Sequence, residues 1–252
     1  MDRPLPLNTR STPAGDRDYF PTPPWATRAL CEALSGRGLL FGSTVWEPAC
    51  GEGYMSRPLG EYFREVRSTD IEDCRDAFPD QDGVVDFLLD WPDPSAPPAS
   101  DWIVTNPPFN RAEEFFELAY RRARVGVAFF VKQQFLEGIG RYRSIFSRHW
   151  PRLILQFAER VPLVKGRVDP EAGTNQAYIW IVWIKRDRFG ALDLDPHAAP
   201  EFGWIGPCRK RLERPDDYPA PAPPAPSAPT ELLALMGEAP AAAAASHEES
   251  NP

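Results

Sequence analysis

The sequence predicts a doubly wound α/β domain, in which helices cover both faces of a mostly parallel, seven-stranded sheet whose last pair of strands is antiparallel. Short apolar segments alternate with helical patterns along most of the chain. The chain has 252 residues, of which 42% are hydrophobic, so it can bury one sizeable core. We expect a single domain over residues 19–190, preceded by a flexible, polar segment at 1–18.

The first expected helix follows the segment Y-F-P-T-P-P at residues 19–24. Thr22 is a favourable N-cap, and the prolines occupy the first turn, where a missing N–H costs nothing. Apolar residues then recur at helical spacing as far as Leu34, and Gly36 ends the helix. Because helix N-termini attract anions, this segment is a candidate ligand-binding element.

A glycine loop follows the first strand, which is expected to end at Glu47. The loop P-A-C-G-E-G contains Gly51 and Gly53, which allow a close approach to a ligand, and a helix is expected from about Tyr54. Ser56 stands where a dinucleotide-binding G-x-G-x-x-G motif would have its third glycine. The loop therefore departs from that motif.

Two further strand ends carry acidic residues. The strand V-R-S-T-D ends at Asp70, about twenty residues after Gly51, where an acidic side chain can reach ribose hydroxyls. A third short strand is expected to close with Asp86 and Phe87, and the nearby Asp90 is an alternative to Asp86.

The stretch D-W-I-V-T-N-P-P-F-N at residues 101–110 organises the rest of the predicted sheet. Its apolar part has the length of a buried strand, and Pro107 and Pro108 cannot continue a ladder because neither has an N–H. The chain must therefore leave the sheet at Asn106. Ligands of open α/β sheets bind beyond the carboxyl ends of strands, so this exit is a candidate site.

The remaining elements complete the expected sheet. We expect a helix up to about Arg124, a strand at 126–131 and a broken helix over 132–148. Two last strands at 153–157 and 177–183 form the antiparallel pair, joined by a long connection.

The tetrapeptide Asn106, Pro107, Pro108 and Phe109 resembles the N-P-P-[FY] signature of amino-methyltransferases, which transfer a methyl group from S-adenosylmethionine to a conjugated nitrogen. The order of the T-P helix, G-x-G loop, acidic strand end, D-F and N-P-P-F resembles that of the adenine-N6 DNA methyltransferases of phages and prophages. These belong to the class I superfamily, and the likeness covers about residues 18–185.

This resemblance implies methylation of the N6 amine of adenine in DNA, with the base flipped out of the helix. The side-chain oxygen of Asn106 and the carbonyl of Pro107 would accept hydrogen bonds from the amine, Pro108 would stiffen the turn and Phe109 would stack on the base. For S-adenosylmethionine, the resemblance and the loop chemistry together imply contacts with Tyr19, Phe20, Thr22, Pro23, Glu47, Pro48, Gly51, Gly53, Asp70, Ile71, Asp86, Phe87 and Asn106.

The net charge of −8 is distributed unevenly. Residues 1–110 carry 9 Lys and Arg against 18 Asp and Glu, residues 111–188 carry 15 against 8, and residues 189–252 carry 4 against 10. A basic middle suits a polyanionic partner, whereas an acidic first part suits a cationic cofactor. Candidate phosphate-binding residues are Arg141, Lys165 and Arg167, although an ordinary basic surface explains them equally well.

The four cysteines show no C-x-x-C spacing and no pairing with the three histidines, so we expect reduced thiols and no metal. The sequence has no run of 18 apolar residues, and its N-terminus lacks the apolar core of a signal peptide. We therefore expect an intracellular protein with no membrane association, and the resemblance implies the cytoplasm of a bacterium or a phage-infected cell.

The C-terminal part divides into an extension at 191–214 and a Pro- and Ala-rich tail at 215–252 that is expected to be disordered. Within the tail, T-E-L-L-A-L-M-G at 230–237 predicts a short helix. This segment either docks on the domain, binds a partner or is inert.

Three alternative functions share the same residues. Adenine-N6 methylation of RNA and N5 methylation of a protein glutamine both act on a conjugated nitrogen. A cofactor-binding subunit without activity would keep the pocket but transfer no methyl group.

Overall fold

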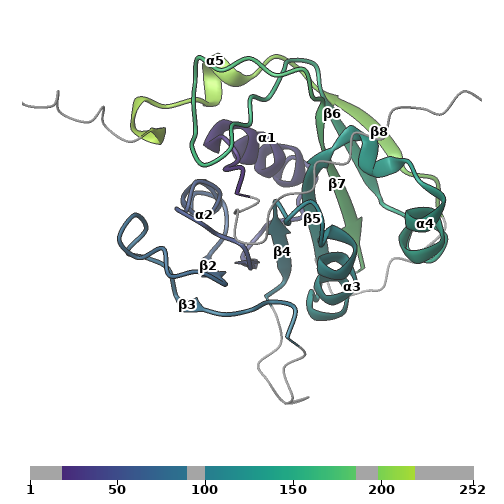
Figure 1. Cartoon of the computed structure of the whole chain (residues 1–252). Coiled ribbons are helices and arrows are strands. Elements are labelled where there is room, and N and C mark those ends of the chain that lie inside the picture. The colour runs from purple at the N-terminus through teal and green to yellow at the C-terminus, as the bar shows by residue number, and fades with distance from the viewer. Residues whose placement is uncertain (1–18, 90–99, 186–197, 219–252) are drawn as a thin grey trace, which may run out of the picture. The chain divides into compact units, whose positions relative to one another are not determined.

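The computed structural model describes residues 19–89, 100–185 and 198–218 (Figure 1). The predictions for residues 1–18, for Asp90 and for residues 219–252, including the expected helix at 230–237, lie outside the described residues.

Within the described ranges, eight strands form one sheet in the order β3-β2-β1-β4-β5-β7-β6-β8. Strand β7 runs antiparallel to both β5 and β6, and all other pairings are parallel. The predicted α/β class, with a mostly parallel sheet and an antiparallel β6–β7 pair, is therefore confirmed. The strands are β1 (Thr44–Glu47), β2 (Glu65–Asp70), β3 (Gly83–Val84), β4 (Trp102–Thr105), β5 (Gly126–Lys132), β6 (Leu153–Phe157), β7 (Tyr178–Ile184) and β8 (Glu201–Ile205).

The strand count differs from the prediction, because β8 extends the sheet to eight strands. It pairs in parallel with β6 along its whole length and forms an edge of the sheet. Its sequence E-F-G-W-I has a central glycine, and its Phe202 and Trp204 are exposed. The sequence pattern therefore lacks the buried alternation that predicts a strand, which an edge position tolerates.

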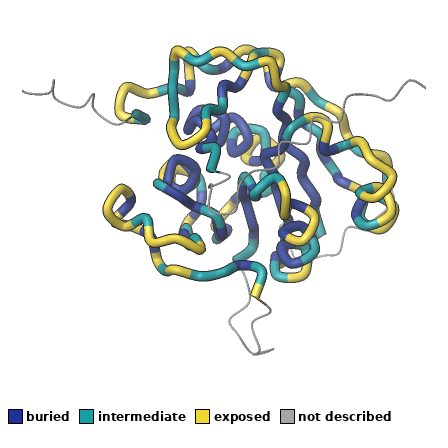
Figure 2. The backbone as a smooth tube through the Cα atoms, viewed as in Figure 1, coloured by how far each residue is buried: buried dark blue, intermediate teal, exposed yellow. Residues whose placement is uncertain are grey.

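Helices cover both faces of the sheet, as a doubly wound fold requires (Figure 1). On one face, α1 (Pro24–Ser35) and α2 (Ser56–Leu59) pack against apolar side chains of β4, β5 and β7. On the other face, α3 (Ala112–Arg122) packs against the alternate side chains of the same strands. These central strands are buried along nearly their whole length (Figure 2). The remaining short elements are the 3-10 helix η1 (Gln133–Leu136), α4 (Ile139–Arg141), the π-helical turn η2 (Tyr142–Phe146), α5 (Arg209–Leu212) and the 3-10 helix η3 (Pro215–Asp217).

Thr22 is not the N-cap of α1, so this prediction was wrong. The helix begins at Pro24, its N-cap residue is Pro23, and no side chain caps it. A proline does occupy the first turn, as predicted. Thr22 lies one residue before the cap position, and its buried hydroxyl accepts a hydrogen bond from Asn106 instead.

Two other element boundaries also differ from the prediction. Strand β3 ends at Val84, so Asp86 and Phe87 follow the strand rather than close it, because the chain turns there with a bond from Leu89 N–H to the Asp86 carbonyl. The helix after the glycine loop begins at Ser56 rather than at Tyr54. The broken helix predicted over 132–148 is confirmed as η1, α4 and η2.

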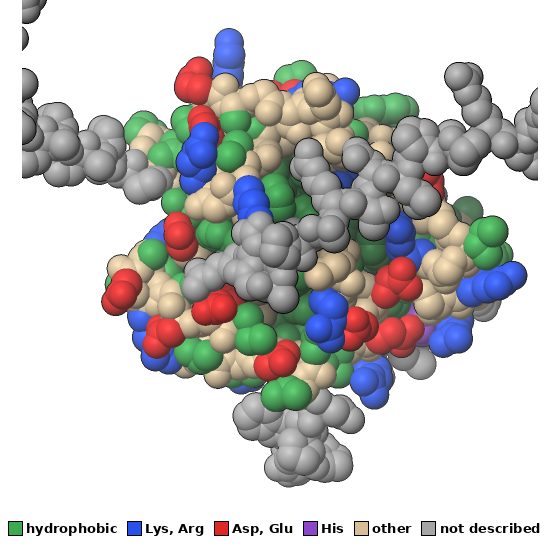
Figure 3. Space-filling model, viewed as in Figure 1, with side chains coloured by type: hydrophobic (Ala, Val, Ile, Leu, Met, Phe, Trp, Pro, Cys, Tyr) green, Lys and Arg blue, Asp and Glu red, His purple; other side chains and the backbone are tan. Residues whose placement is uncertain are grey.

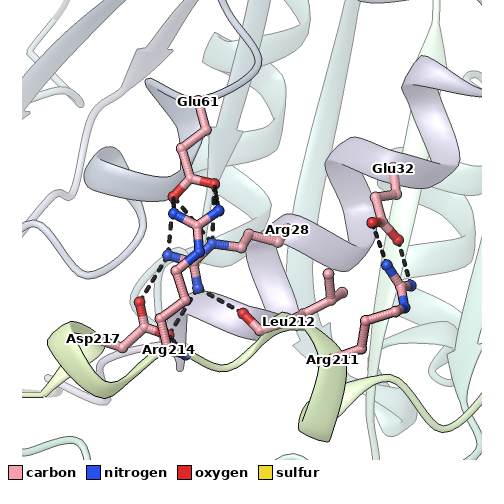
Figure 4. Close-up of polar contacts among 7 residues, drawn as sticks. All are labelled: Arg28, Glu32, Glu61, Arg211, Leu212, Arg214 and Asp217. Carbon is pink, nitrogen blue, oxygen red and sulfur yellow. Dashed lines mark hydrogen bonds and ion pairs between the residues drawn. The ribbon is translucent and has the colours of Figure 1, made fainter.

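A cluster of charged groups holds the end of the described chain against α1 (Figure 4). Arg28, only 4% exposed, donates hydrogen bonds to both carboxylate oxygens of Glu61 and of Asp217, and to the Leu212 carbonyl at 2.7 Å. Arg214 makes a second bidentate contact with Glu61, at 2.9 and 2.7 Å. We call these five residues the C-terminal clasp. It ties α5 and η3 to α1 and to the turn after α2.

Candidate functional site

A pocket of about 340 Å³ lies at the carboxyl ends of β1, β2 and β4. This volume is within the usual range for small-molecule sites, and the position is the one expected for ligands of open α/β sheets. Five chain segments meet there, namely the segment before α1, the glycine loop after β1, the residues after β2, those after β3, and the tetrapeptide after β4.

Most of the residues predicted for the site line this pocket. The predicted residues on its wall are Tyr19, Phe20, Thr22, Glu47, Pro48, Gly51, Asp70, Ile71, Asp86, Phe87, Asn106, Pro107, Pro108 and Phe109. The predicted residues that are not part of the wall are Pro23, Gly53, Arg141, Lys165 and Arg167. The structure thus brings together segments that are as much as 90 residues apart in the sequence.

Asn106 has its side-chain amide held by the segment before α1. Its Nδ2 donates hydrogen bonds to the Phe20 carbonyl at 2.8 Å and to the Thr22 hydroxyl at 3.1 Å. Its Oδ1 is buried and accepts no hydrogen bond from the described residues. An unpaired buried acceptor is costly, so this oxygen is suited to accept a hydrogen bond from a ligand.

The prolines after Asn106 turn the chain out of the sheet, as predicted. The Pro108 carbonyl accepts a bond from the Arg111 N–H at 3.0 Å, whereas no hydrogen bond among the described residues ends on the Pro107 carbonyl. The tetrapeptide therefore offers two unpaired oxygens, one from Asn106 and one from Pro107.

The ring of Phe109 is the aromatic surface of this part of the site. Its centroid lies 5.3 Å from that of Phe20, at an interplanar angle of 39°. The Lys132 ammonium lies over the ring, 4.4 Å from its centroid. Phe109 is thus placed beside the same Phe20 whose carbonyl holds Asn106.

The glycine loop is constrained by its neighbours. Gly51 and Gly53 have φ angles of +48° and +78°, which favour glycine. A Cβ on Gly51 would lie 2.4 Å from the ring of Tyr19, and one on Gly53 would lie 2.4 Å from the ring of Phe78. Gly53 therefore allows the loop to pack against Phe78 outside the pocket, whereas Gly51 lies on the pocket wall.

Asp70 links the loop to the end of β2. Its carboxylate accepts hydrogen bonds from the Gly51 N–H at 2.8 Å and from the Glu72 N–H at 3.0 Å. Burial raises the pKa of Asp70, and these backbone donors partly offset that rise.

Glu47 is the most buried carboxylate of the pocket, at 2% exposure. Burial raises its pKa to about 8, although a hydrogen bond from the Ser56 hydroxyl opposes the shift. Ser56 in turn accepts a hydrogen bond from Ser68 at 2.8 Å. Ser56, which departs from the dinucleotide motif in the sequence, therefore has a role in holding Glu47.

Asp86 and Phe87 form a third part of the wall. Phe87 packs between Trp46 and Phe115, with ring centroids 5.1 and 4.9 Å away. Asp86 accepts a hydrogen bond from the Leu88 N–H at 2.9 Å.

The predicted phosphate-binding residues lie outside the pocket. The Arg141 guanidinium donates to three backbone carbonyls, of Gln134, Phe135 and Glu137, and so closes the turn before α4. Arg141 also pairs with Glu113 of α3 at 3.4 Å, so in the described structure it holds the α4 turn and contacts α3.

Lys165 and Arg167 belong to a hairpin closed by a bridge between Val164 and Arg167. Arg167 is exposed and pairs with Asp169 at 2.9 Å. The hairpin contacts the pocket wall indirectly, because the Gly166 N–H donates to the Tyr19 carbonyl at 2.9 Å.

The sequence analysis missed several residues of the site. Arg111 lies on the wall and forms a bidentate pair with Glu114, and Val85 and Leu88 line the wall beside Asp86. No motif marks these residues. Lys132 is not on the wall but lies over Phe109, and its place there follows from the pairing of β4 with β5.

The described residues contain no cluster of three or more His, Cys, Asp or Glu that could hold a metal ion. All four cysteines are free thiols. No helix in the described part of the chain is long and apolar enough to cross a membrane.

Comparison with known proteins finds no matching family model and no matching curated protein. Among solved structures, the chain is similar to a putative RNA methyltransferase from Pyrococcus horikoshii (14% identity, TM-score 0.47, 63% of this chain and 83% of that chain). It is also similar to a modification subunit of a putative type I restriction enzyme from Vibrio vulnificus YJ016 (17% identity, TM-score 0.47, 75% of this chain), half of whose length it spans. A third is magnesium protoporphyrin IX methyltransferase from Synechocystis PCC 6803 (11% identity, TM-score 0.45, 64% of this chain and 78% of that chain).

These similarities concern the fold alone. The sheet itself, with β7 reversed among strands that otherwise run in one direction, has an α/β Rossmann-like arrangement.

Proposed function

We propose that this protein is an S-adenosylmethionine-dependent methyltransferase that acts on the N6 amine of adenine in DNA. The observation that carries the proposal is the hydrogen bonding of the Asn106 side-chain amide. Its Nδ2 donates hydrogen bonds to the Phe20 carbonyl and to the Thr22 hydroxyl. Its Oδ1 is buried and accepts no hydrogen bond from the described residues. Such an oxygen, next to the unpaired Pro107 carbonyl, suits an incoming N–H₂ group.

The pocket residues fit S-adenosylmethionine in charge and shape. Glu47 would bind the methionine ammonium, and Asp70 would bind the ribose hydroxyls, because both carboxylates lie on the wall beside the glycine loop. A Cβ on Gly51 would clash with the Tyr19 ring, so glycine lets these two wall residues pack closely beside the cofactor. Asp86 and Phe87 would contact the adenine of the cofactor. Bound S-adenosylmethionine would supply an electrophilic methyl group on a cationic sulfonium.

The tetrapeptide would prepare the amine for attack. The lone pair of an exocyclic amine is delocalised into the base, which makes it a weak nucleophile. Hydrogen bonds from its two protons to Asn106 Oδ1 and the Pro107 carbonyl would favour a tetrahedral nitrogen, whose lone pair is free. Alignment of the amine and removal of water from the pocket would contribute most of the rate.

Phe109 would hold the flipped base by stacking, which offsets part of the cost of removing it from the duplex. The proton that leaves the methylated nitrogen would pass to water, because the tetrapeptide carries no base that can take it. The hairpin of Lys165 and Arg167, tied to Tyr19 through Gly166, would contact the DNA backbone beside the pocket.

A methyl-transfer assay tests the proposal. We would incubate the full chain with tritiated S-adenosylmethionine and with duplex DNA, RNA or protein, and we expect label in DNA adenine. Asn106→Ala should reduce transfer at least about 100-fold, the effect of losing a hydrogen-bond partner of the transition state, with cofactor affinity changed little.

Label in RNA or in protein glutamine would instead support one of the two rival substrates. Cofactor binding with transfer to none of the three substrates would support a subunit without activity. Unchanged turnover by Asn106→Ala would refute the assigned role of the tetrapeptide.

A further inference from the structure

We propose, resting on the function above, that Lys132 binds a backbone phosphate of the target nucleotide. The pocket would then select a nucleotide within a nucleic-acid chain over the side-chain amide of a protein. The position of Lys132 at the end of β5, over the Phe109 ring, supports this role.

The register of the sheet places Lys132 beside the tetrapeptide. Strand β5 is parallel to β4, and their last paired residues are Thr105 and Phe129. Lys132 lies three residues beyond Phe129, at the carboxyl end of β5, beside the point where the tetrapeptide leaves β4. The distance of 4.4 Å from Lys132 Nζ to the Phe109 ring centroid agrees with this placement.

Lys132 breaks the apolar pattern of β5 at this point. The six residues before it are all buried, and its side chain follows Ala128 and Phe130 on the face that packs against α1. Lys132 itself is partly exposed, and no acidic side chain of the described residues forms an ion pair with it. A partly buried cation whose only partner among the described residues is an aromatic ring is well placed to receive an anion.

The charges around the pocket are separated by strand order. The acidic residues of the wall follow β1, β2 and β3, on one side of β4, and Figure 3 shows acidic side chains over the loops around β2 and β3. Lys132 ends β5, on the other side of β4. Asn106, at the end of β4, lies between the two. A cationic cofactor on the acidic side would therefore meet an anionic substrate at Asn106.

A nucleotide substrate carries a negative charge that could bind at Lys132, away from the acidic residues of the wall. A base that stacks on Phe109 brings its phosphodiester with it, and a lysine ammonium on a flexible stem can reach that phosphate without a strict orientation. A glutamine side chain in a protein carries no fixed negative charge beside its amide. The alternative is that Lys132 only orients the Phe109 ring, which would not depend on salt in the same way.

Salt-dependent binding distinguishes the two roles. We would measure the affinity of the full chain for a labelled adenine-containing DNA duplex, and for RNA of the same sequence, by fluorescence anisotropy at several salt concentrations in the presence of S-adenosylhomocysteine. The variants are Lys132→Gln, Lys132→Arg and, as a matched control, Lys210→Gln, which removes the same charge from the exposed face of α5.

We expect Lys132→Gln to weaken binding several-fold and to reduce the slope of log K against log salt by about 1. Lys132→Arg should keep the wild-type slope, and Lys210→Gln should leave both affinity and slope unchanged. Whichever of DNA and RNA shows the Lys132-dependent slope is the nucleic acid that the site receives.

A wild-type slope in Lys132→Gln, from a protein that methylates DNA or RNA, would overturn this inference and leave the proposed function intact. Transfer to protein glutamine that is insensitive to Lys132→Gln would also overturn it. A Lys132-dependent slope in a protein that transfers no methyl group would overturn the proposed function alone.

Discussion

Thr22 and Asn106 are joined by a hydrogen bond from the Asn106 amide Nδ2 to the Thr22 hydroxyl, with a distance of 3.1 Å. Together with the Phe20 carbonyl, this contact fixes which end of the amide is left unpaired. Thr22 is therefore a positioning residue for Asn106 in the proposed reaction.

Thr22→Val should reduce kcat for methyl transfer about tenfold or more, because valine has nearly the same shape but accepts no hydrogen bond, so the amide can rotate. Thr22→Ser should restore most of the rate. Steady-state kinetics with DNA and cofactor varied separately check this. A fall in cofactor affinity with unchanged kcat would instead assign Thr22 to cofactor binding.

The raised pKa of Glu47 predicts that cofactor affinity depends on pH. Burial holds its pKa at about 8 in the folded chain, so much of the population is protonated at neutral pH. If the ionised form binds the cofactor ammonium, affinity should rise about tenfold per pH unit up to about pH 8. Calorimetric titration between pH 6 and 9 checks this, and Glu47→Gln should bind weakly with no such dependence.

The raised pKa of Glu47 also predicts that stability without cofactor falls with rising pH, whereas cofactor affinity rises. A carboxyl whose pKa is raised in the folded state stabilises the protein fully below its unfolded pKa, near 4.5, and this contribution is lost as the pH rises towards 8. The wild-type protein without cofactor should therefore lose stability relative to Glu47→Gln between about pH 5 and 8. Parallel stability profiles of the two proteins in denaturant would contradict the assigned pKa.

Gly51→Ala should weaken cofactor binding at least about tenfold and also lower the stability. The new Cβ would lie 2.4 Å from the Tyr19 ring, so that ring must move on the pocket wall, and the φ angle of +48° adds about 1 kcal/mol of backbone strain. Gly42→Ala is the matched control, since its φ is +66° but nothing lies within 4 Å of the added atom. Equal loss of affinity in both variants would show that backbone strain alone is responsible.

Arg28→Met tests the C-terminal clasp. It would leave the buried Asp217 carboxylate without its main cation, which typically costs about 3–5 kcal/mol. Urea unfolding followed by fluorescence measures the loss. Arg211→Gln breaks the more exposed pair with Glu32 shown beside the clasp in Figure 4, and should shift the midpoint little. Similar midpoints for the two variants would show that the clasp adds little stability.

Much of the sheet could be predicted from local patterns. The strands ending at Glu47 and Thr105 contain apolar residues and stop one or two residues before a proline, and the more polar strand V-R-S-T-D stops at Asp70. Because all three strands are parallel neighbours, their carboxyl ends meet at one edge, and the residues there had to come together. β8 could not be predicted, since an exposed edge strand has no buried face to impose a pattern.

The sequence by itself determined that the chain leaves the sheet at Asn106, because two residues without N–H groups cannot continue a ladder. It also determined that the glycine loop and the carboxylates of Glu47 and Asp70 come at the ends of two other strands. Only the tertiary structure decided what each side chain contacts. Hydrogen bonds from Asn106 to Phe20 and Thr22, and the position of Lys132 over Phe109, join residues far apart in the chain. Such contacts depend on strand order and register, which no local pattern specifies.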